Sequence, residues 1–512
     1  MRKTTSFATI ISLLLWTCGG RDAAPTPSFD HVFPPLAGDL MTTSSPGLAD
    51  LTGDGVPDIV FGTGVDRVRP QPGRMVFTGE PEVSGHVVAV SGATNEILWR
   101  VPNPRDAFTT PRFADLNGDA VADVIMGGRE GACSAFSGTD GALLWRVTPA
   151  NVAKTKFPYN FFTPALIRDA TGDGVPDLVV VYGGDDTRMP AAPREPAYLA
   201  AISGADGAIL AVHRTPDGRE SYSSVVRYER PDGAEWLIFG TGGETHGGAA
   251  YRAPVASLLD GSFAARLERL VTAGVKGVIA PATLLELTGD RDLDVVIHTF
   301  DGRLIVLDGA TGNVLWERRE EREEAYHPAA VVRLARDGRL GLFVSRGIGT
   351  FPRYVGSVHR LHDVADGRVL YQYRDPFYPA GAPLAVDLTG DGVDEPFFFS
   401  VRFPTAEGAR IHVLHLGSST LTTHEVAANF WTTPLIVDAR GAGTLEMIGL
   451  SWRQAAKPGT PAWQNVEWQL LRMNLSAKQP AVRSWAAYMG TASDGHYHPT
   501  SRAFSAAGTA PQ

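Results

Sequence analysis

The chain has 512 residues, and its formal net charge of -10 at pH 7 makes a nucleic acid an unexpected partner. It contains two cysteines, Cys18 and Cys133, which are too few for a disulfide framework, a cysteine-based metal site or a c-type haem site. No second long apolar run follows the one near the N-terminus, so we expect the rest of the chain to lie on one side of a membrane.

The first residues have the pattern of a secretory signal. Met1, Arg2 and Lys3 form a charged start, and the apolar run from Ala8 to Trp16 is too short to span a bilayer. We therefore expect the chain to be exported.

The segment Leu15–Gly19 resembles a bacterial lipobox, whose cysteine is lipidated and becomes the new N-terminus. The resemblance implies a lipid anchor at Cys18, although the two residues before it are not the usual small ones, and a plain secretory signal is the alternative. We predict a lipoprotein signal peptide over 1–18 and a flexible tether, rich in Gly, Ala and Pro, over 19–40. The expected location is the cell envelope, as an outer-membrane lipoprotein facing the periplasm or the cell surface.

An aspartate-rich pattern recurs along the chain and is followed by an apolar, β-rich run in each copy. The clearest copies are DLTGDGVPD from Asp50, DLNGDAVAD from Asp115, DATGDGVPD from Asp169, ELTGDRDLD from Glu286 and DLTGDGVDE from Asp387.

A second motif follows in register, with clear copies that end at Trp99, Trp145 and Trp316 and weaker copies that end at Ala211 and Tyr371. Each copy reads as a strand, a tight turn and a second strand. Together with the strands around the aspartate loop, this hairpin makes a four-stranded antiparallel unit, the blade of a β-propeller.

Degenerate copies near 228–239, 331–344 and 436–450 fill the gaps between the clear ones. We therefore predict an all-β propeller of about eight blades over 41–490, with seven blades as the alternative, and a C-terminal tail over 491–512.

These motifs resemble two propeller families. The aspartate loops look like FG-GAP or VCBS repeats, and the hairpins that end in tryptophan look like the PQQ-like (quinoprotein) repeat. The second resemblance implies that each tryptophan docks on the neighbouring blade. Both families include enzymes, scaffolds and adhesins, so the resemblance predicts the fold more strongly than the function.

The aspartate loops are candidate calcium sites. Within nine residues, three carboxylates surround one tight turn, and oxygen-only ligands at this spacing favour calcium over zinc or copper. In the eighth blade, Arg440 is expected to take the place of the metal. The predicted ligands are Asp50, Thr52, Asp54 and Asp58; Asp115, Asn117, Asp119 and Asp123; Asp169, Thr171, Asp173 and Asp177; Glu286, Asp290 and Asp294; and Asp387, Asp391 and Glu395.

Antiparallel blades have two distinct faces. The aspartate face carries the connections between strands 1 and 2 and between strands 3 and 4. The aromatic face carries the connections between strands 2 and 3 and between blades, and its long insertions make it the expected binding surface. Aromatic residues at the blade starts are expected to gather around the channel mouth, namely Phe108, Phe162, Tyr326, Tyr378 and Trp431.

Arginines on and beside the insertions favour an anionic partner, because guanidinium groups bind carboxylate and phosphate in pairs of hydrogen bonds. Those we expect on this rim are Arg67, Arg69, Arg74, Arg188, Arg194, Arg252, Arg346, Arg353, Arg402 and Arg453, with Arg188 and Arg353 as the main candidates.

Three functions are compatible with these features. The first is an envelope propeller that binds a protein or an acidic glycan; it is similar in plan to the eight-bladed scaffold lipoprotein of the outer-membrane β-barrel assembly machinery. The second is a polysaccharide lyase or hydrolase, with His246, Tyr326, His327, His496 and His498 as candidate acid and base groups. The third, a pyrroloquinoline quinone dehydrogenase, lacks the adjacent cysteine pair of many such enzymes. We favour binding.

The lipid anchor is directly testable. Expressed in a bacterium, the wild type should partition with membranes and the Cys18→Ala variant with the soluble fraction. Equal partition of the two proteins, together with an N-terminal peptide of the wild type that carries no acyl mass, would contradict the anchor.

Overall fold

The computed structural model describes residues 27–498 except 65–67, 72–73, 78–84, 130, 153–158, 185–191, 403–407, 428, 455–465 and 479–483. Cys18 and the rest of the predicted signal peptide lie outside the described residues. Within the described part, no helix has the length and apolar character needed to cross a membrane.

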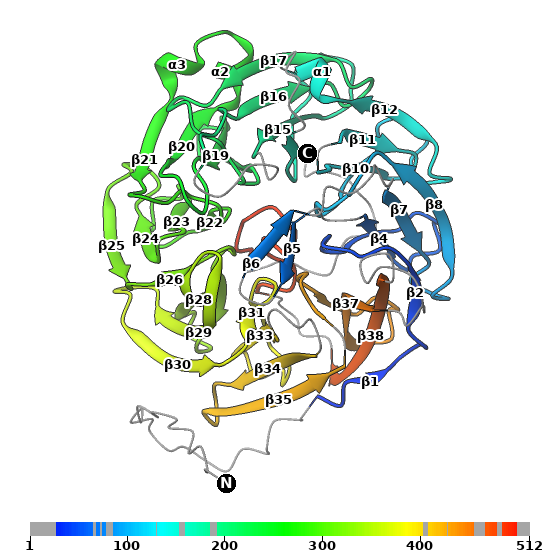
Figure 1. Ribbon diagram of the computed structural model, residues 1–512, viewed down its shortest axis with the longest axis vertical. Coiled ribbons are helices and arrows are strands. Elements are labelled where there is room, and N and C mark those ends of the chain that lie inside the picture. The colour runs from blue at the N-terminus through cyan, green and yellow to red at the C-terminus, as the bar shows by residue number, and fades with distance from the viewer. Residues whose placement is uncertain are drawn as a thin grey trace.

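Eight antiparallel sheets stand in a ring (Figure 1), which confirms the predicted eight-bladed β-propeller. Blades 1 to 4 consist of β3 (Gly47–Ala49), β4 (Asp58–Thr63), β7 (Gly85–Val90) and β8 (Ile97–Asn103); β9 (Arg112–Ala114), β10 (Asp123–Met126), β11 (Cys133–Phe136) and β12 (Leu143–Val147); β14 (Ala165–Ile167), β15 (Asp177–Gly183), β16 (Tyr198–Ile202) and β17 (Ile209–Arg214); and β18 (Val226–Glu229), β19 (Glu235–Gly240), β20 (Ala249–Pro254) and β21 (Glu268–Thr272).

Blades 5 to 8 continue around the ring in chain order. They consist of β22 (Thr283–Leu285), β23 (Asp294–His298), β24 (Arg303–Leu307) and β25 (Val314–Arg319); β27 (Ala330–Arg333), β28 (Leu340–Thr350), β29 (Arg353–Asp363) and β30 (Val369–Asp375); β32 (Leu384–Val386), β33 (Glu395–Val401), β34 (Ala409–His415) and β35 (Thr420–Val426); and β36 (Leu435–Val437), β37 (Thr444–Gln454) and β38 (Val466–Lys478).

Short elements complete the secondary structure of the described residues. Three two-residue strands extend the inner edge of blades 3, 6 and 7, β5 and β6 form a separate hairpin, and three helices of four or five residues lie beside blades 3 and 4. Their bounds are β13 (Asn160–Phe161), β26 (Glu323–Glu324), β31 (Tyr378–Pro379), β5 (Val68–Gln71), β6 (Arg74–Phe77), α1 (Pro149–Val152), α2 (Val255–Leu259) and α3 (Phe263–Arg266).

Burial follows the position of a strand within its blade. The second strands, such as β4, β10 and β15, are buried at every residue, because neighbouring blades cover both faces of each sheet. The outer strand β8 alternates instead, with Trp99 buried between exposed neighbours. The continuous apolar runs after each aspartate loop are therefore the sequence signature of the second strands.

The ring closes through the N-terminal segment. β1 (Asp30–His31) and β2 (Leu36–Asp39) pair antiparallel with β38 and supply the outermost strand of blade 8. Figure 1 shows β1 and β2 along the outer edge of that blade. Part of the segment predicted as a flexible tether over 19–40 thus belongs to the propeller, and for residues 30–39 that prediction is wrong.

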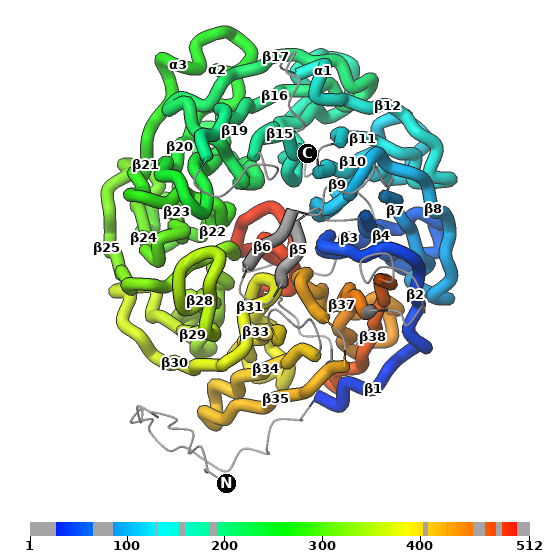
Figure 2. The backbone as a smooth tube through the Cα atoms, viewed as in Figure 1, coloured from blue at the N-terminus to red at the C-terminus, as the bar shows by residue number. Residues whose placement is uncertain are grey.

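An axial segment, residues 484–498, crosses the centre of the ring (Figure 2, red). It bonds to innermost strands of several blades: Trp485 exchanges two backbone hydrogen bonds with Ala385, the Ala486 carbonyl accepts from Ile436, and Leu284 bonds to both Gly495 and Tyr497. The predicted division between a propeller ending at residue 490 and a separate tail does not match this continuous segment.

Each described hairpin between strands 3 and 4 in blades 1, 2, 3 and 5 is tied to its own aspartate loop. In blade 2, the Gly138 N–H donates to Asp123 Oδ1 at 3.0 Å, while Asp123 Oδ2 accepts from Leu116 N–H at 2.8 Å. A Cβ atom at Gly138 would lie 2.1 Å from the Ala122 carbonyl oxygen, so only glycine allows this approach. The equivalent glycine and carboxylate pairs are Gly92 with Asp58, Gly204 with Asp177 and Gly309 with Asp294.

The carbonyl group of the same glycine binds the preceding blade. Trp99 Nε1 donates to the Gly138 carbonyl at 2.8 Å, and Trp145 Nε1 donates to the Gly204 carbonyl at 2.6 Å. Trp316 makes the corresponding bond to Val364 of blade 6 at 2.7 Å. The docking of tryptophan on the next blade, which the PQQ-like resemblance implied, is thereby confirmed.

Arginine replaces tryptophan at two other blade junctions. Arg252 of blade 4 donates to the Gly309 carbonyl, and Arg472 of blade 8 donates to the Gly92 carbonyl at 2.6 Å. A buried guanidinium at these positions therefore makes the same contact as an indole.

We predict that Gly138→Ala lowers the free energy of unfolding by about 3 kcal/mol, since it forces an overpacked contact and disturbs the hydrogen bonds of both the N–H and the carbonyl of this residue. Gly274→Ala is the matched control, because a Cβ there meets its nearest atom at an ordinary 3.5 Å. The control should stay within about 0.5 kcal/mol of wild type in denaturant unfolding. Equal stability of the two variants would contradict the tight approach.

Candidate functional site

The aspartate loops are held together by bonds from their own backbone. In the first loop, Asp50 accepts from Gly53 N–H at 2.7 Å and Gly55 N–H at 2.9 Å, and Asp58 Oδ2 accepts from Leu51 N–H at 2.9 Å. The loops that begin at Asp115, Asp169, Glu286 and Asp387 repeat the bond from the glycine three residues on to the first carboxylate. Each loop is thus a folded turn in its own right.

The axial segment and the aspartate loops differ in how closely their ionisable ligand atoms approach. Among the described residues, the group of three His, Cys or carboxylate ligand atoms that all lie within 4.8 Å of one another is found in the axial segment. In the second loop, the Asn117 amide donates to Asp119 at 3.2 Å and to Asp123 at 3.4 Å. A cation in that loop would therefore replace an amide between two carboxylates.

Electrostatics in these loops nevertheless favour a cation. Burial raises the pKa of Asp58, Asp123 and Asp294, and neighbouring carboxylates add to the rise. Burial likewise raises the pKa of Glu395 to about 8, with a further contribution from Asp387 and Asp391. The ligand set is chemically suited to calcium, and an ion would remove this repulsion.

Arginines already neutralise two of the loops. In blade 7, Arg333 of the preceding blade lies 2.9 Å from Asp394 and 3.7 Å from Asp387. In blade 8, Arg440 Nε lies 3.4 Å from Glu446, which confirms that a guanidinium occupies this loop. The sequence did not point to Arg472, which makes the stronger bonds to Glu446 at 2.8 and 3.0 Å.

The aromatic residues of the blade starts gather in two clusters on the aromatic face. The first aromatic cluster contains Phe108, Phe162 and Tyr222, with ring centroids 5.6 and 6.1 Å apart, and the Arg129 guanidinium lies 4.6 Å from the Phe108 ring. Phe108 and Tyr222 are half-buried, so part of each ring faces solvent.

The second aromatic cluster spans blades 5 to 8 and contains Phe300, Tyr326, Tyr354, Tyr378 and Trp431. Tyr326 lies 4.7 Å from Phe300 and 6.5 Å from Tyr378, and Tyr378 lies 4.9 Å from Tyr354 and 5.7 Å from Trp431, between ring centroids. Tyr326, Tyr354 and Trp431 are half-buried. The structure therefore brings together three of the predicted aromatic residues.

The carboxylate of Glu324 holds the second aromatic cluster in place through a hydrogen bond to one of its tyrosines. The Tyr354 hydroxyl donates to Glu324 Oε2 at 2.6 Å, Lys276 pairs with the other carboxylate oxygen, and the Tyr326 and Tyr354 hydroxyls lie 3.3 Å apart. Burial raises the pKa of Tyr326 and Tyr378 well above the usual range, so both phenols stay neutral. The rings are fixed in place before any partner arrives.

Sequence reasoning missed Tyr222, Phe300 and Tyr354. Tyr222 begins blade 4 without the proline that follows the other blade-start aromatics. Phe300 lies in the connection between strands 2 and 3 of blade 5, and Tyr354 is the second residue of β29, just after the corresponding connection of blade 6. Those connections reach the same face as the blade starts, so a search for aromatics in and directly beside both kinds of connection would have found all three.

The predicted arginine rim is only partly present. Arg252 and Arg346 do not belong to it: the first is buried against Trp236 and Gly309, and the second lies inside blade 6 against His298 at 2.8 Å. Both lie within strands whose side chains face a neighbouring strand or blade. Arg353 is exposed at the start of β29, whereas Arg188, Arg67 and the side chains of Arg69 and Arg74 lie outside the described residues.

The remaining rim arginines contact other side chains of this chain. Arg194 lies 3.3 Å from Glu220, Arg453 lies 3.3 Å from Glu467, and the Arg402 guanidinium lies 5.2 Å from the Phe377 ring. This reduces the positive charge that the rim offers to a partner.

The candidate acid and base groups lie in different surroundings. His246 lies 3.5 Å from Glu220, and partial burial lowers the pKa of His327 to about 4. His496 and His498 belong to the axial segment, where both lie beside Asp494. Their contacts do not assemble them with Tyr326 into one catalytic group.

Comparison with known proteins places the fold. No protein-family model matches the chain, and no curated protein matches it. Among solved structures, it is similar to a europium-containing methanol dehydrogenase (11% identity, 86% of this chain and 93% of that chain, TM-score 0.52). It is also similar to quinohemoprotein alcohol dehydrogenases from Comamonas testosteroni (10% identity, TM-score 0.54) and Pseudomonas putida HK5 (13% identity, TM-score 0.53), each over 87% of this chain and 77% of that chain.

At these identities the similarity shows the fold alone. It agrees with the PQQ-like character of the tryptophan hairpins and with eight blades, while activity has to be argued from the residues of this chain.

Asp375, which lies three residues before Tyr378, should make the stability of the fold depend on pH. Burial by itself would raise the pKa of Asp375, but its contacts with His412 at 3.0 Å and Arg410 at 3.1 Å and the bond from Phe377 N–H lower that pKa to about 2. A carboxyl whose pKa is depressed in the folded state stabilises the fold above its unfolded pKa and loses that contribution as the pH falls.

We therefore predict that about 2 kcal/mol of stability is lost as the pH falls from about 4 to 2, and that Asp375→Asn removes this part of the acid dependence. Asp366→Asn, at an exposed acid in the same blade, should keep it. Denaturant unfolding at several pH values measures the effect, and identical acid profiles for wild type and Asp375→Asn would refute it.

Proposed function

We propose that the protein is an envelope lipoprotein whose propeller binds a protein or glycan partner on the aromatic face. The observation that carries this proposal is the second aromatic cluster, in which aromatic rings from four consecutive blades pack together and three of them, Tyr326, Tyr354 and Trp431, stay half-buried. Rigid aromatic side chains lose little conformational freedom on binding, and they stack on sugar rings or pack on apolar side chains.

Aromatic contact carries more of the proposed binding than charge. Most of the described rim arginines contact acidic or aromatic residues of this chain, and Arg353 is exposed and directly precedes Tyr354 of the second cluster. An acidic glycan or an acidic protein segment suits this surface, with the rings supplying most of the affinity and arginine supplying selectivity.

The test combines a glycan array with a pulldown from an envelope extract. Phe108→Ala and Trp431→Ala should each lower capture by about 10-fold or more, as expected for aromatic anchors. Arg188→Glu and Arg353→Glu should lower capture mainly at low salt. The matched control is Leu143→Ala, which removes an exposed apolar side chain from the outer strand β12.

Unchanged capture by the aromatic variants, or loss of capture in the Leu143→Ala control, would place the binding surface elsewhere. Circular dichroism of each variant verifies that the propeller is folded.

We also propose that calcium binds the aspartate loops. Support comes from the oxygen-only ligands and from the burial and repulsion that raise the carboxylate pKa values. Such ions would be structural, because the loops lie on the face opposite the aromatic clusters. The anchor at Cys18 remains part of the same proposal.

Calcium at 100 times its dissociation constant should raise stability by about 2.7 kcal/mol per site, and chelation should remove that gain. Asp119→Ala should lose part of the response, because it deletes a carboxylate of the second loop. Asp232→Ala, a turn aspartate outside the five loops, should keep it whole. A melting curve that chelator does not shift would leave these loops as ordinary turns.

The similarity in fold to quinoprotein dehydrogenases favours a second candidate, a pyrroloquinoline quinone dehydrogenase. Reconstitution with the quinone distinguishes the two functions. A bound-quinone absorption spectrum with turnover of an alcohol supports the enzyme, and the absence of both at saturating quinone supports the binding protein.

A further inference from the structure

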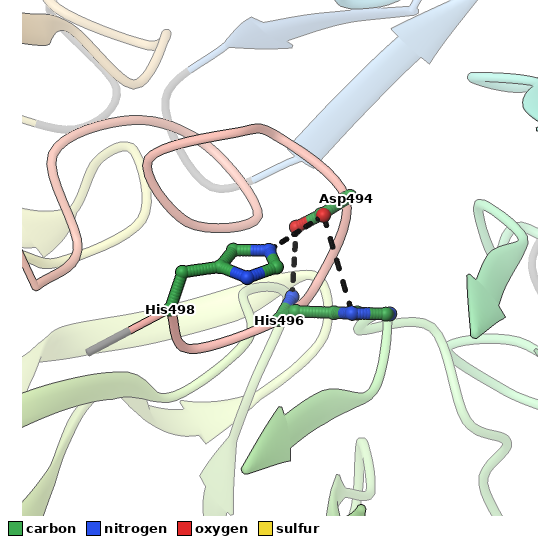
Figure 3. Close-up of side chains that lie close together, drawn as sticks. All are labelled: Asp494, His496 and His498. Atoms are coloured by element: carbon green, nitrogen blue, oxygen red, sulfur yellow. Dashed lines mark hydrogen bonds and ion pairs between the residues drawn. The ribbon is translucent and has the colours of Figure 1, made fainter. Parts of the chain in front are cut away.

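The axial segment brings three side chains of metal-binding types together around a turn at Gly495. Asp494, His496 and His498 present ligand atoms that all lie within 4.8 Å of one another (Figure 3). Asp494 Oδ2 lies 2.8 Å from His498 Nε2 and 4.0 Å from His496 Nδ1. We propose that these three residues bind a divalent transition metal, with zinc as the expected ion.

The fold of the axial segment creates this arrangement. The amide of Leu284 in β22 donates to the Gly495 carbonyl, and the Tyr497 amide donates to the Leu284 carbonyl, each at 2.8 Å. The chain turns at Gly495, whose φ is +88°, and the backbone N–H of His496 donates to Asp494 Oδ1 at 3.0 Å, so the turn brings the side chains of residues 494, 496 and 498 together. Glycine is required at 495, where a Cβ would lie 2.8 Å from Val226.

His496 is oriented as a ligand by a second hydrogen bond. Its Nε2 lies 2.8 Å from the Arg227 carbonyl oxygen. A carbonyl can only accept, so Nε2 carries the proton and Nδ1 keeps a free lone pair on the side of Asp494. Metal-bound histidines usually donate their other ring N–H to a carbonyl or carboxylate in this way.

Asp494 and His498 hold the remaining positions. His498 Nε2 shares a proton with Asp494 Oδ2. The other carboxylate oxygen of Asp494 accepts a hydrogen bond from the backbone N–H of His496 at 3.0 Å. A divalent ion would replace the shared proton. It would then have two nitrogen ligands and one oxygen ligand, a set that suits zinc rather than the calcium expected of the aspartate loops.

The site is reachable from solvent. The side chains of Asp494 and His498 are 37% and 40% exposed, against 12% for His496. Three protein ligands leave a fourth tetrahedral position, which water or a small ligand can fill from the exposed side. The nearby Arg112 guanidinium acts electrostatically on Asp494, and it lowers the affinity to be expected.

The experiment uses protein without a histidine tag, dialysed against chelator and then titrated with zinc in excess calcium, so that the aspartate loops are saturated. Calorimetry should give one zinc per chain, and cobalt should give the visible absorption of a tetrahedral site. His498→Ala and His496→Ala should weaken zinc binding by at least about 10-fold and lose the cobalt spectrum.

His31→Ala, at an exposed histidine on β1, is the matched control and should bind as the wild type does. Because His498 is partly exposed, His498→Ala should fold normally, and its melting temperature without metal verifies this. Absence of stoichiometric binding in the wild type, undiminished binding in His498→Ala, or equal loss in the control would overturn the site.

Discussion

At four of the hairpins between strands 3 and 4, a single glycine residue holds a blade to the preceding one. At Gly138 its N–H binds the buried carboxylate of the same blade, and its carbonyl accepts the indole N–H of Trp99 from the preceding blade. A Cβ atom at Gly138 would collide with the carbonyl oxygen of Ala122, the residue that precedes Asp123. The glycine, the carboxylate and the tryptophan are thus parts of a single contact, which explains why the two motifs recur in register.

This contact separates the two faces of the ring by role. The aspartate face carries the bonds that join blades, so its loops are constrained in sequence whether or not a metal occupies them. The rings of the aromatic face lie on a scaffold that these bonds have already fixed. That division favours binding on the aromatic face.

The repeats predicted the blades because the periodic contact leaves a periodic sequence. Blade 8 was harder to recognise, since the buried Arg472 makes the contact that tryptophan makes elsewhere. Ring closure was not predictable: β1 and β2 have no repeat motif, and their strand structure depends on pairing with β38, more than 400 residues away in the sequence.

The candidate site was predictable in part. Blade-start aromatics such as Tyr326 and Trp431 could be placed on one face from topology alone. The pairing of Arg194 with Glu220 could not be predicted, because the two residues lie in loops outside the repeat motifs. The cluster of Asp494 with His496 and His498 was also hidden, because it requires the axial segment to turn at Gly495 and to bond to Leu284 of β22.

Hydrogen exchange at the hairpin glycines tests the central contact most directly. The amides of Gly92, Gly138, Gly204 and Gly309 lie in turns near the surface, yet each donates to a buried carboxylate. If the contact holds the ring, these amides should exchange with solvent as slowly as the amides of the central strands β4, β10, β15 and β23. Exchange at the rate of exposed turns, with those strands still protected, would contradict it.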